Sequence, residues 1–259
     1  MRGVYPAIRM TRILRIDAHG TTELDDTLAI EEPLEIRVND KAVSVTLRTP
    51  GDDFDLAAGF LFTESILRDG GDVESFRHWG SPNVVRVGLR DGVRIDMARL
   101  QRNFYSASSC GVCGKASIDA VRVHTSALAS SLSVAPSVVT SLPDALRTAQ
   151  KTFDATGAIH GAGIFSPDGA LLRAREDIGR HNAVDKVIGS FFREGVTLDR
   201  HVLVVSGRAS FEIVQKAIVA RIRVLVAVGA PSTLSVELAR EMGLTLYGFV
   251  REGRFNAYA

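Results

Sequence analysis

The chain has 259 residues, of which 46% are hydrophobic and 24% are charged, and its formal net charge is +1. This length allows one large domain, or a small domain joined to a medium one, and either can bury a sizeable core. The near-neutral balance excludes the bulk charge signature of a nucleic-acid-binding protein and that of an acidic disordered chain.

The first twenty residues lack the apolar core and the small-residue cleavage site of a secretory signal peptide. The longest apolar runs are far shorter than the ~20 residues that a membrane-spanning helix needs. We therefore expect a cytoplasmic protein that binds neither a membrane nor nucleic acid.

The N-terminal half contains patterns typical of strands. Residues 33–48 alternate apolar and polar side chains on both sides of Asn39-Asp40 and predict a hairpin with one buried face. A helix should follow, capped by Asp52 or Asp53 and extending to Arg68. A second hairpin is predicted within residues 84–97, with its turn at Asp91-Gly92.

Residues 127–141 are rich in Ser, Ala and Pro and show no periodicity, which makes them the best candidate for an internal boundary. We divide the chain into an N-terminal β-rich region, residues 1–126, and a core domain, residues 127–259. Beyond Pro143, strands and helices alternate. The expected helices cover 144–154, 183–193, 212–220 and 233–241, and the expected strands cover 158–165, 170–174, 202–205, 224–228 and 244–249. This order predicts an α/β fold with a parallel sheet between helices.

Both cysteines of the chain lie in one motif, Ser-Cys-Gly-Val-Cys-Gly-Lys, as Cys110 and Cys113. A structural disulfide is disfavoured in the cytoplasm, and flanking glycines and serines disfavour inert buried thiols. A zinc site would need further ligands, and there is no second CxxC and no H-x3-5-H pair, although ligands could assemble in space. Disulfide exchange is a stronger generic alternative. A small-residue loop also suits a thiolate that accepts sulfur as a persulfide, with Lys115 favouring its charged form.

Two segments predict an anion site. The run Arg175–Lys186, which contains Arg180 and His181, leads into a helix, where free N–H groups favour anions; a solvated surface turn explains its charge about equally well. The turn Ser206-Gly207-Arg208-Ala209-Ser210 follows a predicted strand at its carboxyl end, where open α/β sheets bind ligands. Ser206, Arg208 and Ser210 supply donors, and Gly207 permits close approach. Neither segment matches a dinucleotide fingerprint or a P-loop.

Two further segments are less specific. His160 lies in an apolar strand, where a lone histidine is more often a satisfied core residue, but the glycines beside it would let a ligand come close. The tail after the last strand is either a frayed basic end or the edge of a pocket, with Arg251 or Arg254 on phosphate and Phe249 or Phe255 against a base.

These motifs occur in the order Ser-Cys-Gly-Val-Cys-Gly-Lys, His-Gly-Ala-Gly, Arg-Glu-Asp-Ile-Gly-Arg-His-Asn, Ser-Gly-Arg-Ala-Ser and Gly-Phe-Val-Arg. In this order they resemble the formate dehydrogenase accessory sulfurtransferases, the FdhD family, from about Glu32 to the end. The resemblance implies a cytidine-deaminase-like layered α/β core with an added N-terminal β-rich region. The zinc deaminase signature is absent, so deamination is not expected.

The resemblance also implies a sulfurtransferase that acts as a sulfur carrier. A cysteine desulfurase would deliver a persulfide to Cys110, with Cys113 assisting, and the sulfur would pass to the molybdenum or tungsten bis-molybdopterin guanine dinucleotide cofactor of formate dehydrogenase. The family binds that cofactor at a segment matching Phe249, Val250, Arg251, Glu252, Gly253 and Arg254. Its guanine nucleotide fits the anion sites inferred at Arg180, His181, Ser206, Gly207, Arg208 and Ser210.

The resemblance further implies a homodimer. Three alternatives stay open: a chaperone that binds the cofactor without transferring sulfur, a dithiol oxidoreductase, and a zinc ion shared by two CxxC loops across a dimer. The choice between molybdenum and tungsten, and whether Cys113 is indispensable, do not follow from the sequence.

Overall fold

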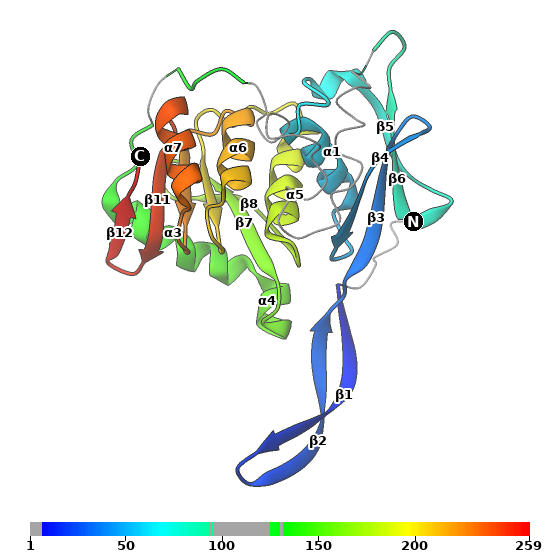
Figure 1. The fold of residues 1–259 in the computed structure, drawn as a ribbon, viewed down its shortest axis with the longest axis vertical. Coiled ribbons are helices and arrows are strands. Elements are labelled where there is room, and N and C mark those ends of the chain that lie inside the picture. Colours follow the sequence, from blue (N-terminus) through cyan, green and yellow to red (C-terminus); the bar gives the residue numbers. More distant parts are fainter. Residues whose placement is uncertain (1–6, 94, 96–124, 130–131) are drawn as a thin grey trace.

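A computed structural model describes residues 7–93, 95, 125–129 and 132–259 (Figure 1). Three sheets are present in this part of the chain: a two-stranded sheet, a four-stranded sheet of order β4-β3-β6-β5 and a six-stranded sheet of order β12-β11-β10-β9-β7-β8. The strands are β1 (Ile8–Asp17), β2 (Gly20–Ala29), β3 (Glu32–Val38), β4 (Lys41–Arg48), β5 (Val73–Trp79), β6 (Ser81–Leu89), β7 (His160–Phe165), β8 (Leu171–Asp177), β9 (Val202–Val205), β10 (Val224–Ala227), β11 (Thr245–Arg251) and β12 (Arg254–Ala257). The helices are α1 (Asp53–Thr63), the short 3-10 helix η1 (Gly70–Asp72), α3 (Pro136–Ala149), α4 (Lys151–Thr156), α5 (Arg180–Phe192), α6 (Phe211–Val219) and α7 (Thr233–Met242).

In the N-terminal half, the first predicted hairpin is confirmed as β3 and β4. The second predicted hairpin is wrong for residues 84–89, because β6 lies between β3 and β5 and both of its edges are occupied. Strand β5 precedes β6 in the chain, and the turn between them is at Gly80. Residues 94, 96 and 97 of the predicted partner strand lie outside the described residues. Helix α1 ends at Thr63, five residues before the predicted end. Asp52 is at its N-cap but has a left-handed backbone and makes no capping hydrogen bond through its side chain.

The core sheet is mixed, so the prediction of a parallel sheet is only partly correct. Strands β9, β10 and β11 are parallel, while β7 and β12 run antiparallel to their neighbours. The difference arises at two tight reversals, after β7 and after β11, that return the chain beside the strand it has just left. The predicted strands 202–205 and 224–228 lie on β9 and β10 with at most one residue of difference.

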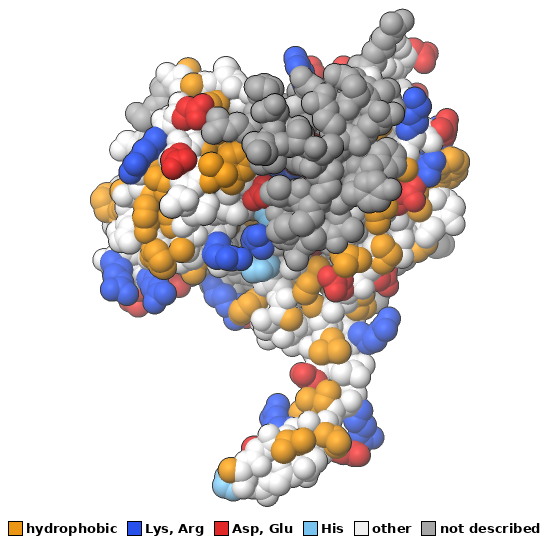
Figure 2. Space-filling model, in the orientation of Figure 1, with side chains coloured by type: hydrophobic (Ala, Val, Ile, Leu, Met, Phe, Trp, Pro, Cys, Tyr) orange, Lys and Arg blue, Asp and Glu red, His pale blue; other side chains and the backbone are white. Residues whose placement is uncertain are grey.

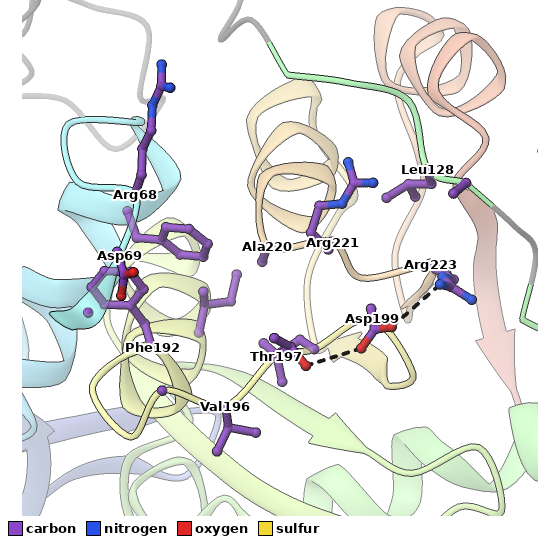
Figure 3. A pocket seen from close by; sticks show the side chains of 16 residues that line it. Arg68, Asp69, Leu128, Phe192, Val196, Thr197, Asp199, Ala220, Arg221 and Arg223 are labelled. Carbon is purple, nitrogen blue, oxygen red and sulfur yellow. Dashed lines mark hydrogen bonds and ion pairs between the residues drawn. The ribbon is translucent and has the colours of Figure 1, made fainter.

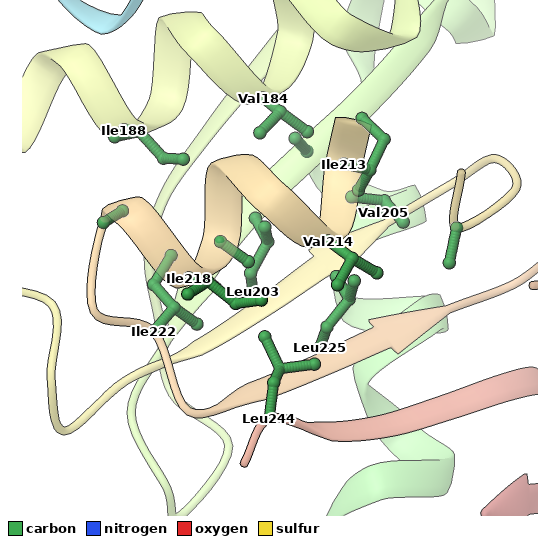
Figure 4. Packing of buried hydrophobic residues seen from close by; sticks show 14 of the residues in the cluster. Val184, Ile188, Leu203, Val205, Ile213, Val214, Ile218, Ile222, Leu225 and Leu244 are labelled. Atoms are coloured by element: carbon green, nitrogen blue, oxygen red, sulfur yellow. The ribbon is translucent and has the colours of Figure 1, made fainter. Parts of the chain in front are cut away.

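Helices cover both faces of this sheet, which explains its nearly continuous apolar strands. Val202 and Val204 of β9 pack toward α3, whereas Leu203 and Val205 pack toward α5 and α6 (Figure 4). The predicted start of α3 was wrong: the helix begins at Pro136, because proline suits the first helical position, where no N–H is needed. None of the described helices is both long and apolar enough to cross a membrane.

Helix α1 joins the two larger sheets. One side of α1 covers the four-stranded sheet through Leu56, Ala57 and Leu61, and the other lies against α5. The two helices touch where each has a glycine: a Cβ at Gly59 would lie 1.8 Å from the carbonyl oxygen of Asp185, and a Cβ at Gly189 would lie 2.0 Å from that of Asp55. The division of the chain at residues 126 and 127 stays a prediction.

We predict that Gly59→Ala destabilises the protein by about 3 kcal/mol, because the added methyl group meets backbone atoms that cannot rotate away. Denaturant unfolding of the variant and the wild type measures this difference. Gly71→Ala is the matched control, since its Cβ would meet only the exposed side chain of Asp69, at 3.2 Å. Equal unfolding free energies for Gly59→Ala and the wild type would show that the helices are not in this close contact.

Candidate functional site

Several strands of the core sheet place their ends at one edge. Because β8 and β9 are both antiparallel to β7, they run in the same direction, and their carboxyl ends meet the start of β7 at His160. The turn after β9 is held there by two bonds: the Ser206 N–H donates to the Gly161 carbonyl (3.0 Å), and the Gly161 N–H donates to Ser206 Oγ (2.9 Å). The sheet thus brings the predicted anion-binding turns together.

The adjoining turns continue this edge toward β11. The N–H of Gly229, after β10, donates to the carbonyl of Gly207 (3.0 Å), and the N–H of Phe249 donates to the carbonyl of Gly229 (3.1 Å). Gly229 allows this approach, because a Cβ there would lie 3.0 Å from the oxygen of Gly207. Phe249 is therefore linked by backbone bonds to the Ser206–Ser210 turn.

Two helices begin at the same edge, α5 after Gly179 and α6 after Ser210. Gly179 has no side chain that could cap α5, and the Ser210 side chain accepts no hydrogen bond from α6. At α6, the Nε2 atom of His181 lies 3.2 Å from Ser210 Oγ and 3.7 Å from Glu212 Oε2. Burial acts to raise the pKa of Glu212, but hydrogen bonds from His181, from its own N–H and from Ser210 outweigh it and lower the pKa to about 2. An ionised carboxylate therefore occupies the start of α6. The start of α5 also has a carboxylate, because Asp177 Oδ1 accepts from the Gly179 N–H (2.9 Å), but Asp177 is paired with Lys186. The start of α5 is for that reason the better place for an anion.

Positive charge surrounds Gly207. A Cβ at this glycine would lie 3.4 Å from His160 Nδ1 and 4.0 Å from Cδ of Arg180, and Arg208 is exposed beside it. Burial lowers the pKa of His160, and the charges of Arg180, His181 and Arg208 lower it further, against a smaller opposing effect of Asp177. On the face seen in Figure 2, Lys or Arg side chains gather around a histidine beside a hydrophobic surface. The site is cationic around a neutral imidazole.

A buried ion pair fixes the loop that leads into α5. Lys186 Nζ lies 2.7 Å from Asp177 Oδ2, and both side chains are almost fully buried. Lys186 also donates to the carbonyl of Thr49 (2.8 Å), while the Thr49 N–H donates to Asp177 (3.2 Å). The N–H of Ile178 donates to Thr49 Oγ1 (3.2 Å). Thr49, Asp177 and Lys186 position the start of α5, and the sequence pattern around Thr49 did not predict this role.

The predicted tail segment is divided between different environments. The side chain of Phe249 is 40% exposed, whereas Val250 is fully buried among residues that face α3. Arg251, Glu252, Gly253 and Arg254 form the exposed turn between β11 and β12, so the tail is a paired strand and not a frayed end. Phe255 packs on Tyr247, with ring centroids 4.8 Å apart. Its ring is therefore not the surface on which a base would stack, which was one of the two alternatives predicted from the sequence.

Cys110 and Cys113 lie outside the described residues, so their predicted roles stay predictions. Within the described ranges, no group of three or more His, Cys, Asp or Glu side chains could hold a metal ion. A cavity of about 410 Å³ lies at the opposite edge of the core sheet, between the C-terminal ends of α5 and α6 (Figure 3). Its walls include Phe62, Phe192 and Arg221. None of the described residues that we predicted to bind the nucleotide lines this cavity.

The chain is similar in sequence to known proteins of one family. The sequence model of the FdhD/NarQ family matches residues 29–259. The chain is 48% identical over 260 residues to a Streptomyces coelicolor protein named sulfur carrier protein FdhD, covering 96% of this chain and 92% of that protein. It is 49% identical over 258 residues to a Mycolicibacterium paratuberculosis protein of the same name, covering 95% of each.

A solved structure shows the same fold. The crystal structure of a putative formate dehydrogenase accessory protein from Desulfotalea psychrophila superimposes with a TM-score of 0.77 and 23% sequence identity, over 98% of this chain and 97% of that one. The expected fold class, a layered α/β core with an added N-terminal β-rich region, is confirmed.

We predict that His160 makes the folded protein less stable at acid pH. Its pKa is lowered from the ordinary value of 6.5, so below that pH the unfolded chain takes up a proton that the folded protein resists, and stability falls as the pH falls. Between about pH 7.5 and about pH 5.5, His160→Gln should therefore lose less stability than the wild type in thermal unfolding. His19→Gln, in the exposed turn after β1, is the control. Identical pH dependence of the wild type and His160→Gln would contradict the assignment.

Proposed function

Since the chain belongs to the FdhD/NarQ family, we propose that it is a sulfur carrier that serves the maturation of formate dehydrogenase. The observation that supports this proposal best is the meeting of Arg180, Arg208 and the Ser206–Ser210 turn at one sheet edge, beside the start of α5. Such a site suits the phosphates of a nucleotide. It gives a carrier protein a place to hold the acceptor of the sulfur.

In the first step, the Cys110 thiolate attacks the terminal sulfur of a persulfide on a cysteine desulfurase. The new S–S bond forms on Cys110 as the old one breaks, and the thiolate of the desulfurase leaves. Cys113 assists this transfer, and Lys115 favours the thiolate form. In the second step the S–S bond on Cys110 breaks, its electron pair stays on Cys110 as the regenerated thiolate, and the terminal sulfur leaves as a neutral sulfur atom. The reduced metal of the acceptor would take up this atom and supply the two electrons that convert it into sulfide.

The acceptor is the molybdenum or tungsten bis-molybdopterin guanine dinucleotide cofactor, which this protein binds as a substrate. Its guanine nucleotide would place phosphate near Arg180, Arg208 and the start of α5, where the charges are complementary. The partly exposed ring of Phe249 is the surface that the base would stack on. The exposed β11–β12 turn, with Arg251 and Arg254, extends the same side of the site.

We predict that Arg208→Ala weakens the binding of guanosine diphosphate about tenfold or more, because a charge-assisted hydrogen bond contributes ~1.5–3 kcal/mol. Isothermal titration calorimetry at one fixed salt concentration measures the affinity. Arg200→Ala is the control, since Arg200 is also exposed but precedes β9 and so lies at the opposite edge of the sheet. An equal loss of affinity in both variants would show that the nucleotide is attracted only by the general positive charge of the protein. If the wild type bound no guanosine diphosphate, the proposed nucleotide site would be refuted.

We predict that incubation with a cysteine desulfurase and cysteine adds one sulfur atom, about 32 Da, to the wild-type protein, and that Cys110→Ala abolishes the addition. Intact-protein mass spectrometry under non-reducing conditions measures it, and Cys113→Ala tests the assisting role. Nucleotide binding without sulfur addition would favour the cofactor chaperone. Reversible Cys110–Cys113 disulfide formation coupled to a protein substrate would favour the oxidoreductase, and bound zinc in purified protein would favour the shared metal site.

A further inference from the structure

The cavity of about 410 Å³ at the C-terminal ends of α5 and α6 lies away from the proposed nucleotide site (Figure 3). The loops that follow α1, α5 and α6 form its walls, together with Leu128 and Ala129. The anion-binding turns lie at the opposite ends of the same two helices. Cavities that bind small molecules have volumes of about 300–1,000 Å³, so this one is large enough for a ligand of its own.

Two aromatic rings form an apolar wall of the cavity. Phe62 of α1 and Phe192 of α5 stack with ring centroids 4.6 Å apart and with 22° between their planes. Ile188 and Leu198 extend this wall. Its position is fixed, because a Cβ at Gly70 would lie 2.6 Å from the carbonyl oxygen of Phe192, so η1 packs directly on the end of α5. A rigid apolar wall of this kind suits a flat ring system.

Arg221 lies across the cavity from Phe192 (Figure 3). Its guanidinium group donates to the carbonyl of Ser126 (2.9 Å), to Ser126 Oγ (3.1 Å) and to the carbonyl of Ala127 (3.3 Å). In the part of the chain that the structure describes, these partners are neutral oxygens, and no carboxylate pairs with Arg221. A guanidinium has more N–H donors than these bonds use, so Arg221 can also bind an anion.

The other charged side chains of the walls leave the cavity positive. Asp199 lies 3.6 Å from Arg223, and Asp69 accepts a hydrogen bond from the Gly71 N–H (2.8 Å). Both carboxylates of the described walls therefore have partners already. The same walls carry three guanidinium groups, those of Arg68, Arg221 and Arg223. This excess of positive charge favours an anionic ligand over a cationic one.

The backbone of Arg221 indicates that its side chain is needed at this position. Its φ of 63° lies in the left-handed region, where glycine is the usual residue at the end of a helix. The turn that follows α5 has such a glycine, Gly195, with a φ of 69°. An arginine in this conformation raises the energy of the native state, and residues that are kept in spite of this cost cluster at ligand sites.

We propose that this cavity is a binding site for an aromatic carboxylate. The ring system lies against Phe62 and Phe192, and the carboxylate pairs with Arg221. The planar fork of a guanidinium matches the two oxygens of a carboxylate, and the stacked phenylalanine rings supply the apolar contact. This inference does not depend on the proposed sulfur transfer.

The first test is isothermal titration calorimetry of the full chain with 2-naphthoate as the probe. The wild type should bind it with a Kd on the order of 100 µM, and Arg221→Gly should weaken binding about tenfold or more. Glycine adopts a positive φ freely, so this variant keeps the turn after α6. Arg200→Ala is the control, because Arg200 is exposed at the same edge of the sheet but does not line the cavity. No binding by the wild type at about 1 mM, or equal affinities of the two variants, overturns the proposal.

The second test separates the carboxylate from the rings. The neutral probe 2-naphthalenemethanol has the same rings, and it should bind the wild type about tenfold more weakly than 2-naphthoate and be insensitive to Arg221→Gly. Equal affinity of the wild type for both probes would contradict the role of the charge.

Hydrogen exchange of the wild type locates the bound probe. Addition of 2-naphthoate should slow amide exchange in residues 195–199 and 220–223, which belong to the walls of the cavity. Exchange in residues 206–210, at the opposite edge of the sheet, should stay unchanged. Slower exchange at 206–210 alone would show that the probe binds as an anion at the nucleotide site, and this result would overturn the proposal.

Discussion

The contact of α1 with α5 at Gly59 and Gly189 determines where everything else in the N-terminal half can lie. Because both helices approach to backbone contact, the four-stranded sheet on the far side of α1 is held at a fixed distance from the core sheet. That placement brings the end of β4 against the end of β8, where Thr49 meets the Asp177–Lys186 pair. The position of the α5 start, and with it the best anion site of the sheet edge, therefore depends on two residues without side chains.

Buried charges reinforce this joint. Asp185 of α5 accepts from Lys216 of α6, with both oxygens at 2.9 Å, and from Thr63 of α1 at 2.8 Å. Burial opposes the charge of Lys216, but the carboxylates of Asp185 and Glu64 outweigh it and raise the pKa of the lysine. Removal of one member of such a pair leaves an unpaired charge in the interior, which costs ~3–5 kcal/mol. The three helices are thus joined by polar contacts that specify one arrangement.

The sequence predicted the core sheet well because its strands are apolar on both faces, as shown by the close agreement for β9 and β10. The anion-binding turns at Arg180 and at Ser206–Ser210 could be predicted because the carboxyl ends of strands that run in the same direction lie at one edge of a sheet, where ligands bind. Pairing was harder: β6 has the same local pattern whether its partner precedes or follows it, and only the tertiary structure selects β5. The role of Thr49 was missed because it acts on a residue 128 positions away, and no local pattern carries that information.

Phe249 shows how the site and the stability of the fold oppose each other. Its φ of 52° is in the left-handed region, where a residue with a Cβ raises the energy of the native state and glycine does not. Natural drift toward a more stable fold would favour glycine there, yet glycine would remove the one aromatic ring that β11 exposes beside the Gly229 turn. A thermostability screen of this protein would therefore select glycine at position 249, and it would remove the aromatic surface of the site without any change in the fold.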